Sequence, residues 1–436
     1  MILIHTEQQT NRVRYIFHLF FHDLFGTEYL LTSDSGHFLT WSGPKFSYGI
    51  QPLEDELFIR AVPLLFEKGT DSPVPECVEI SGSKVLFPIQ DQNSAFPFDL
   101  FAASFYLVTR YEEYETVYKD QHGRFNPLHS IAFKENFLDK PVVNIWALKL
   151  KDILLIHFPN LVFSARSFRF LPTIDIDSAY AYRHKGFWRT AGGFLRSLSR
   201  GDLSEMKERC HVIQGGLSDP FDTYGYLSIL HKKFDLSPYF FILLGDYGPY
   251  DKNLSPRNKH FRELVARLAA EHTIGIHPSY ASHDHPARLK SEILRLASII
   301  NRKVTISREH FLRITMPYTF RNLISSGIEC DFTMGYAQEP GFRASICTPY
   351  LFYDLYDDKS TSLRIYPFTV MDGTLRDYKN LSPEQASEVI NVLIGEIKAV
   401  NGIFISIWHN ETLGDQKRWK GWRTVYEKMI LHALDS

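Results

Sequence analysis

The sequence predicts an α/β protein in two parts, a (β/α)7-type barrel over residues 166–436 and a smaller α+β domain over residues 1–165 before it. The chain has 436 residues, which is long for a single core. After residue 165, apolar runs of strand length alternate with helical stretches, which is typical of parallel βαβ units. Seven such strands predict a closed or nearly closed barrel. Before residue 165 the pattern is irregular, with short strands and many turns.

The expected elements follow from hydrophobic periodicity. Strands are expected at residues 168–177, 238–245, 273–277, 303–308, 328–332, 363–370 and 403–409. Helices between them are expected at residues 258–271, 286–300 and 382–400. The first part contains one clear helix, in FPFDLFAASFYLVTRYEEYETV, where Phe101, Phe105 and Val108 recur at helical spacing.

Composition excludes several classes of protein. With 44% hydrophobic and 22% charged residues, the chain is typical of a folded protein rather than a disordered one. The formal net charge of −2 gives no basic footprint, so we expect no nucleic-acid partner. The four cysteines form no CxxC pair, which argues against a disulfide framework and against a thiolate zinc site.

The N-terminal residues do not indicate secretion. MILIHTEQQTNRVRY lacks the features of a signal peptide, and no apolar stretch reaches the roughly 20 residues that cross a bilayer. A cytoplasmic protein is therefore the default expectation. The segment NRVRYIFHLFFHDLFG is partly amphipathic and could contact a membrane surface, although a helix packed inside its own domain is the commoner explanation.

Polar side chains end most of the expected strands. Asp175 and Asp177 lie two residues apart on a strand, so they project to the same side. Two carboxylates that close raise each other's pKa unless a cation lies between them. The other strand ends carry Asp246, His277, Arg308, His310, Asp331, His409 and Asn410. Carboxylates and imidazoles that meet at one rim predict a site for zinc or a similar divalent ion.

Four motifs resemble a known family. TIDID, GIHPSY, SREHFLRITMPYTF and ISIWHN resemble, in order and spacing, the motifs of the polysaccharide deacetylases, carbohydrate esterase family 4, also called the chitooligosaccharide-deacetylase homology domain. The resemblance covers residues 166–436. It implies a distorted (β/α) barrel that removes N- or O-acetyl groups from sugars with a divalent metal. The whole chain is similar to bacterial proteins that pair this domain with an N-terminal domain of undefined function.

The resemblance also implies roles for particular residues. Asp175 would be the general base and Asp177 a metal ligand, while His409 would protonate the leaving group. Arg308 would position the catalytic acid. His277 matches the first histidine of the family's metal-binding His-x-x-x-His, but Ala281 stands where the second would be.

Three histidines could supply the third ligand in place of residue 281. His283 and His285 follow a few residues later, and His310 ends the fourth strand. Period-two geometry places His310 on the same side as Arg308, which favours His310. A site with two ligands, or a lost site, is the alternative. Zinc is the expected ion, with cobalt or nickel as alternatives.

Two further residues are candidates for substrate contacts. Asp331 could orient Arg308, touch substrate or only begin a turn. Arg343, in GFR, offers a guanidinium for a phosphate or carboxylate on the substrate, although structural arginines are common.

Three functions fit these residues. The first is a metal-dependent hydrolase that deacetylates an amino sugar, glycan or glycan precursor in surface polysaccharide biosynthesis. The second is a degenerate, non-catalytic relative that binds carbohydrate or a partner protein, which Ala281 suggests. The third is a metal-free glycosidase with Asp175 and Asp331 as its two carboxylates, which leaves the histidines without a role.

Overall fold

The computed structural model describes residues 1–71 and 74–435 and has a nine-stranded sheet in its C-terminal part. The strand order is β12-β13-β11-β10-β9-β8-β7-β15-β14, and all neighbouring pairs are parallel except β12 with β13. The strands are β7 (Arg169–Ile176), β8 (Tyr239–Leu243), β9 (Thr273–His277), β10 (Ile306–Ser307), β11 (Cys330–Asp331), β12 (Tyr350–Asp354), β13 (Lys359–Ile365), β14 (Val370–Met371) and β15 (Ile403–His409). Every expected strand region contains a strand. The region expected as one strand at 363–370 holds two, because Pro367 between β13 and β14 cannot donate to a ladder.

The sheet curves strongly but does not close among the described residues. The rings of Phe241 on β8 and Phe332 just after β11 lie with centroids 5.4 Å apart. Two strands separate β8 from β11, so a flat sheet would hold these rings roughly 14 Å apart. The ladder ends at β12 on one side and at β14 on the other. The expected barrel is therefore open, because β12 turns back antiparallel beside β13 and β14 has only two residues.

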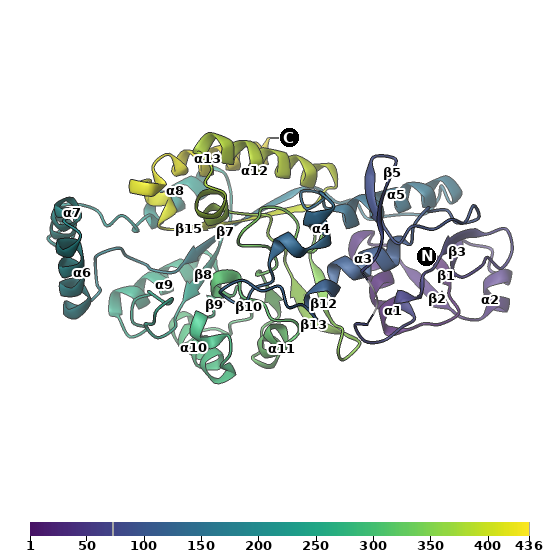
Figure 1. Cartoon of the computed structure of the whole chain (residues 1–436), viewed down its shortest axis with the longest axis horizontal. Helices are drawn as coiled ribbons and strands as arrows, with labels where there is room; N and C mark the ends of the chain where they lie inside the picture. Colours follow the sequence, from purple (N-terminus) through teal and green to yellow (C-terminus); the bar gives the residue numbers. More distant parts are fainter. Residues whose placement is uncertain (72–73, 436) are drawn as a thin grey trace.

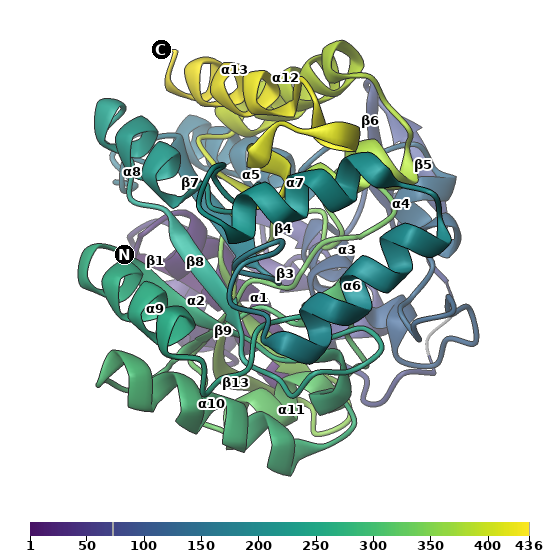
Figure 2. The ribbon, with the colours of Figure 1, turned by 90° about the vertical axis from the view of Figure 1, so that its left-hand side faces the viewer.

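Helices cover the outer face of this curved sheet, and the side chains of its inner face form a separate cluster. Figures 1 and 2 show α12 and α13 along one edge of the molecule and α9, α10 and α11 along the opposite edge. The predicted helices are confirmed as α9, α10 and α12, and each buries its apolar stripe. A capping box between Ser382 and Gln385 starts α12. The helices are α6 (Phe187–Ser199), α7 (Leu203–Ile213), α8 (Tyr224–Lys233), α9 (Lys259–Glu271), α10 (Pro286–Ile300), α11 (Tyr318–Ser325), α12 (Pro383–Ala399) and α13 (Trp422–Leu434).

The N-terminal part has its own sheet, in the order β2-β1-β3-β4. Its four strands are all parallel, which is an α/β arrangement rather than the expected α+β one. Strands of four or five residues are too short to show a clear period in the sequence. Its elements are β1 (Ile2–His5), α1 (Asn11–Phe17), β2 (Tyr29–Thr32), α2 (Ser35–Thr40), β3 (Lys45–Gly49), β4 (Leu57–Arg60), the hairpin β5 (Cys77–Ile80) with β6 (Ser83–Leu86), α3 (Leu100–Val108), α4 (Ile131–Lys134) and α5 (Val142–His157).

The amphipathic segment near the N-terminus is packed inside this part. It forms α1 and the π-helical segment η1 (His18–Leu24), and Val13, Ile16, Phe17 and Phe20 are fully buried. These apolar side chains are therefore covered by the protein's own core rather than turned toward a bilayer. Within the described chain, no helix has both the length and the apolar character needed to span a membrane.

A buried ionic network joins the two parts of the chain. Arg343 binds Glu113 through two nitrogens, at 3.0 Å from Nε and 2.5 Å from Nη2. Arg110 binds the same carboxylate at 2.8 Å and donates to the Tyr336 hydroxyl at 2.9 Å. Arg110, Glu113 and Arg343 are all buried. Arg343, a candidate for substrate contact, thus fixes the loop after β11 to the N-terminal part.

Replacing Arg343 by methionine is expected to lower the free energy of unfolding by about 3 kcal/mol, because the variant leaves the buried Glu113 carboxylate with one guanidinium instead of two. Urea denaturation of the full chain measures the change. Arg364→Met is the matched control, since Arg364 is partly exposed and lies 3.8 Å from Asp23. Such a pair contributes about 1 kcal/mol or less. Equal losses in the two variants would contradict the structural role of Arg343.

Candidate metal centre and catalytic site

The polar strand ends meet in one pocket at the carboxyl edge of the large sheet. The cavity has a volume of about 320 Å³. Its walls include the ends of β7, β9 and β15 and the turns after β10 and β14. The pocket gathers Asp175, Asp177, His277, His310, Asp372 and His409. Parallel strands place these residues together because their carboxyl ends share one edge of the sheet.

Asp177, His277 and His310 form a cluster with the donor set of a divalent metal site. One ligand atom from each lies within 4.8 Å of the others. His277 Nε2 is 3.3 Å from Asp177 Oδ1, and His310 Nε2 is 3.5 Å from Asp177 Oδ2. Two imidazole nitrogens and a carboxylate, with room for further ligands, are typical of catalytic zinc and related ions.

Hydrogen bonds turn both histidines toward the cluster. His277 Nδ1 lies 2.5 Å from the carbonyl oxygen of Arg308, and His310 Nδ1 lies 2.9 Å from Asp251 Oδ1. Partners of this kind commonly orient metal-binding histidines. With its proton on Nδ1, His277 presents a lone pair at Nε2, so Nε2 cannot donate to Asp177. Asp177 Oδ1 is buried and has no hydrogen-bond partner among the described residues, which fits an ion between these atoms.

The charges of the cluster also favour a cation. Burial opposes ionisation of Asp177, but the nearby His310, with His409, more than offsets this effect and holds the pKa of that carboxyl well below its usual range. Burial lowers the pKa of His310, whereas Asp177 and Asp251 raise it, to about 9. A divalent ion would take the place of the imidazole proton, so ion binding and proton release are expected to be coupled.

His310, rather than His283 or His285, joins this cluster. Ala281 lies in a short turn whose backbone N–H donates to Asp251. His283 Nε2 lies 3.2 Å from Thr315 Oγ1, and His285 is an exposed residue at the start of α10. His310 follows the neighbouring strand β10 and lies beside Asp177 and His277.

Asp175 lies beside the cluster and is held by an arginine. Its Oδ1 accepts a hydrogen bond from Arg308 Nη1 at 2.7 Å, and its Oδ2 lies 3.9 Å from His277 Nε2. Arg308 is fully buried, donates to the Phe332 carbonyl at 3.1 Å and packs over the Phe241 ring. One oxygen of Asp175 is therefore fixed, and the other faces the pocket.

His409 is across from Asp175 on the adjacent strand. The register of β15 with β7 pairs the two residues. His409 Nδ1 lies 2.8 Å from Asp372 Oδ1, and His409 Nε2 lies 3.8 Å from Asp177 Oδ2. Burial lowers the pKa of His409, but the nearby carboxylates of Asp372 and Asp177 more than offset this effect. The pKa of His409 therefore lies well above its ordinary value. The imidazolium form is thus favoured here.

Two partner carboxylates were missed by sequence reasoning. Asp251 orients His310, and Asp372 orients His409. Each had a signal in the sequence: Asp372 follows the apolar residues of β14 in VMDG, and Asp251 lies in GDYGPYDKN, a polar loop after a strand. The strand predicted at 363–370 ends two residues before Asp372, so this strand end carried the signal although Asp372 was not counted among the polar strand ends.

Several candidate residues lie outside the pocket. Asp331 is buried and accepts from Ser307 Oγ at 2.8 Å and from Thr333 N at 2.9 Å, and burial raises its pKa to about 7. Neither Asp331 nor Arg343 is among the residues that line the cavity in the described chain. Asp246 is mostly exposed and pairs with Arg295 at 3.0 Å.

The N-terminal part contributes Arg124 to the cavity wall. Its guanidinium binds Asp120 at 2.7 Å, the Phe311 carbonyl at 3.0 Å and the Tyr378 hydroxyl at 3.2 Å. Phe311 is the residue next to His310, so residues 1–165 help to fix the turn that carries this histidine. No spacing rule could relate Arg124 to Phe311 and Tyr378, which lie 187 and 254 positions away.

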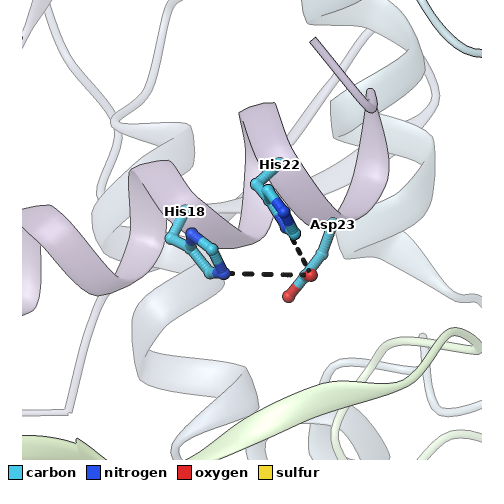
Figure 3. Close-up of side chains that lie close together, drawn as sticks. All are labelled: His18, His22 and Asp23. Carbon is cyan, nitrogen blue, oxygen red and sulfur yellow. Dashed lines mark hydrogen bonds and ion pairs between the residues drawn. The ribbon is translucent and has the colours of Figure 1, made fainter. Parts of the chain in front are cut away.

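A second group of possible ligands lies on η1 (Figure 3). His22 Nδ1 is 3.0 Å from Asp23 Oδ1, and His18 Nε2 is 4.0 Å from the same oxygen. The Arg364 guanidinium also lies 3.8 Å from that oxygen. Because the guanidinium already supplies positive charge and the His22 side chain is 65% exposed, this group fits a metal ion less well than the pocket does.

A family model matches the first part of the chain. Residues 2–159 match the model of a family of unknown function, DUF7033. A search of curated proteins finds no match. A candidate polysaccharide deacetylase from Mycobacterium smegmatis is similar in structure, at 15% identity and a TM-score of 0.42, over 62% of this chain and 86% of its own.

Two other solved structures show a similar degree of likeness. PuuE allantoinase has 14% identity and a TM-score of 0.38, over 62% of this chain and 84% of its own. A polysaccharide deacetylase from Bacillus cereus has 12% identity and a TM-score of 0.29, over 62% of this chain and 87% of its own. These similarities are low, so the function proposed below rests on the geometry of the site.

Proposed function

We propose that this protein is a metal-dependent hydrolase that removes an acetyl group from an amino sugar, a glycan or a glycan precursor used in surface polysaccharide assembly. The single observation that carries the proposal is the Asp177–His277–His310 cluster with Asp175 on one side and His409 on the other. The motifs that resemble polysaccharide deacetylases support the choice of an acetylated sugar.

Each residue has a definite task in this reaction. A divalent ion held by Asp177, His277 and His310 would supply Lewis-acid polarisation of the acetyl carbonyl and an acidified water. Asp175 accepts the proton of the attacking water, since Arg308 fixes one of its oxygens and leaves the other free. His409 in its protonated form donates a proton to the departing nitrogen or oxygen, and Asp372 keeps it charged and oriented.

The two parts of the chain contribute differently to the site. We assign residues 166–436 as the catalytic domain and residues 1–165 as a separate domain that shapes the cavity through Arg124. The end of the family match at residue 159 is consistent with a boundary near 165.

Metal content and acetate release together test the proposal. Protein purified without a histidine tag is expected to hold about one equivalent of zinc or a similar ion. It is then expected to release acetate from N-acetylglucosamine oligomers or O-acetylated sugars. Wild-type protein that binds no zinc, cobalt or nickel would overturn the proposal. Protein that binds metal but releases no acetate from either substrate class would favour a carbohydrate-binding role instead.

Asp251→Asn is expected to weaken zinc affinity by about 10–100-fold, because the amide holds the His310 ring less firmly than the carboxylate does. Competition with a chromophoric chelator measures the affinity. Asp246→Asn is the matched control, because Asp246 is an exposed aspartate after the same strand and pairs only with Arg295 among the described residues. Equal zinc affinities in the two variants would show that Asp251 does not support metal binding through His310.

A further inference from the structure

A large cationic groove lies beside the metal pocket. It has a volume of about 910 Å³ and lies between the α6–α7 pair and the loops after β8 and β15. The α6–α7 pair stands off the body of the molecule at the left of Figure 1 and faces the viewer in Figure 2. Eight of the lining residues are lysines or arginines, and two are glutamates. The whole chain has a net charge of −2, so this concentration of positive charge is local.

The groove and the metal pocket are adjoining spaces. Glu411, Arg418 and Trp419 line both of them. These residues follow β15, the strand that ends in His409. The groove and the pocket therefore share one wall, and His409 lies on the pocket side of it.

Several cations in the groove have no acidic partner. Arg209 pairs with Glu205 at 3.1 Å and Lys417 pairs with Glu208 at 2.8 Å. Lys185, Arg196 and Arg200, in contrast, form no ion pair among the described residues. Burial and the nearby Arg189 guanidinium lower the pKa of Lys185 to about 8. An anion in the groove would restore the charged form of this amine.

The walls of the groove are held in place. Arg189 donates to the carbonyls of Asn253 at 2.8 Å and of Lys252 at 2.9 Å, and its guanidinium packs on the Tyr247 ring. Arg209 lies so close to Gly193 that a Cβ there would be 2.3 Å from Nη1. The glycine thus allows a buried guanidinium to lie against α6.

We propose that this groove binds the phosphate or diphosphate group that links the acetylated sugar to its carrier, and that it thereby places the sugar in the metal pocket. This inference rests on the proposed deacetylase function. One guanidinium group can donate two parallel hydrogen bonds to two oxygens of a phosphate. A site with several guanidinium groups therefore selects phosphate over a neutral sugar. The volume suits a diphosphate with part of its carrier.

The surface of α6 favours a lipid carrier. Phe187, Trp188, Leu195 and Leu198 are exposed, with Trp188 at 84% and Leu195 at 68%. An amphipathic helix with exposed aromatic and leucine side chains next to arginines is typical of a membrane-surface helix. A polyprenyl diphosphate would place its apolar tail against these residues, whereas a nucleotide would use only the cationic groove.

Binding of two probes tests the proposal. The probes are UDP-N-acetylglucosamine, followed by calorimetry, and phosphatidylcholine vesicles that contain polyprenyl diphosphate, followed by cosedimentation. The double variant Arg196→Gln/Arg200→Gln is expected to bind the preferred probe at least about tenfold more weakly than wild type. The matched control is Arg288→Gln/Lys290→Gln, which removes two exposed cations from α10 and is expected to bind normally.

The outcomes separate the carriers and the alternatives. Tight binding to the diphosphate-containing vesicles indicates a lipid carrier, and tight binding to UDP-N-acetylglucosamine indicates a nucleotide carrier. Equal binding by the two double variants, or no binding to either probe, would overturn the proposal. Vesicles in which phosphatidylglycerol replaces polyprenyl diphosphate control for general surface charge, and equal binding to them would also overturn it.

Acetate release from neutral N-acetylglucosamine oligomers separates this inference from the proposed function. If the protein releases acetate from the neutral oligomers but does not bind the phosphate probes, the proposed deacetylase function stands and the proposed role of the groove is wrong. If phosphate binding depends on Arg196 and Arg200 but no substrate releases acetate, the groove binds phosphate as proposed and the proposed deacetylase function is wrong.

Discussion

Replacing His310 by alanine is expected to empty the metal centre and abolish acetate release. His310 is one of three side chains that offer a ligand atom within 4.8 Å of the others, and two ligands hold a divalent ion poorly. Losing a group that orients a metal-binding histidine typically lowers metal affinity by about 10–100-fold. Losing the histidine itself is expected to lower zinc affinity by more than that. Mass spectrometry of metal content, with acetate release measured on the same sample, checks both effects.

Two neighbouring histidines provide controls for this variant. His283→Ala and His285→Ala remove the other candidates for the third ligand but are expected to keep wild-type metal content. His283 lies 3.2 Å from Thr315 Oγ1, and His285 is exposed. If His283→Ala lost the metal and His310→Ala kept it, the assignment of the third ligand would be wrong.

Replacing Asp175 by asparagine is expected to lower kcat by about 10²–10⁴-fold while zinc stays bound. The amide keeps the shape of the carboxyl and can still accept from Arg308, but it cannot take a proton from water. Asp177, His277 and His310 are unchanged, so metal content is expected to match wild type. Steady-state kinetics on metal-loaded protein measures the change.

The buried Arg308 guanidinium loses its charged partner in this variant, so stability must be followed as well. Breaking a buried ion pair costs about 3–5 kcal/mol, which thermal unfolding would detect. Asp331→Asn is the control, because Asp331 is a buried carboxyl near Arg308 that lies outside the cavity lining. A fall in kcat as large for Asp331→Asn as for Asp175→Asn would contradict the assignment of the base and would favour the glycosidase alternative.

The sequence predicted the positions of the strands in the large sheet better than it predicted whether the sheet closes into a barrel. Alternating apolar runs and helical stripes located β7, β8, β9 and β15 within a few residues, because burial imposes those periods on the chain. Closure of the barrel depends on how the two ends of the sheet meet, and here the ladder ends at the antiparallel β12 on one side and at the two-residue β14 on the other. The parallel sheet of the first part was missed, since its short strands carry too few residues for a period to be read.

The same distinction applies to the site. By itself, the sequence determined that acids and imidazoles end successive strands, and therefore that Asp175, Asp177, His277 and His409 share one rim, because parallel strands bring their carboxyl ends together. Only the tertiary structure decided that His310, and not His283 or His285, lies beside Asp177 and His277, that Asp251 and Asp372 orient the histidines, and that Arg124 lines the cavity. Those relations depend on distances between loops far apart in the chain, and local periodicity carries no information about such distances.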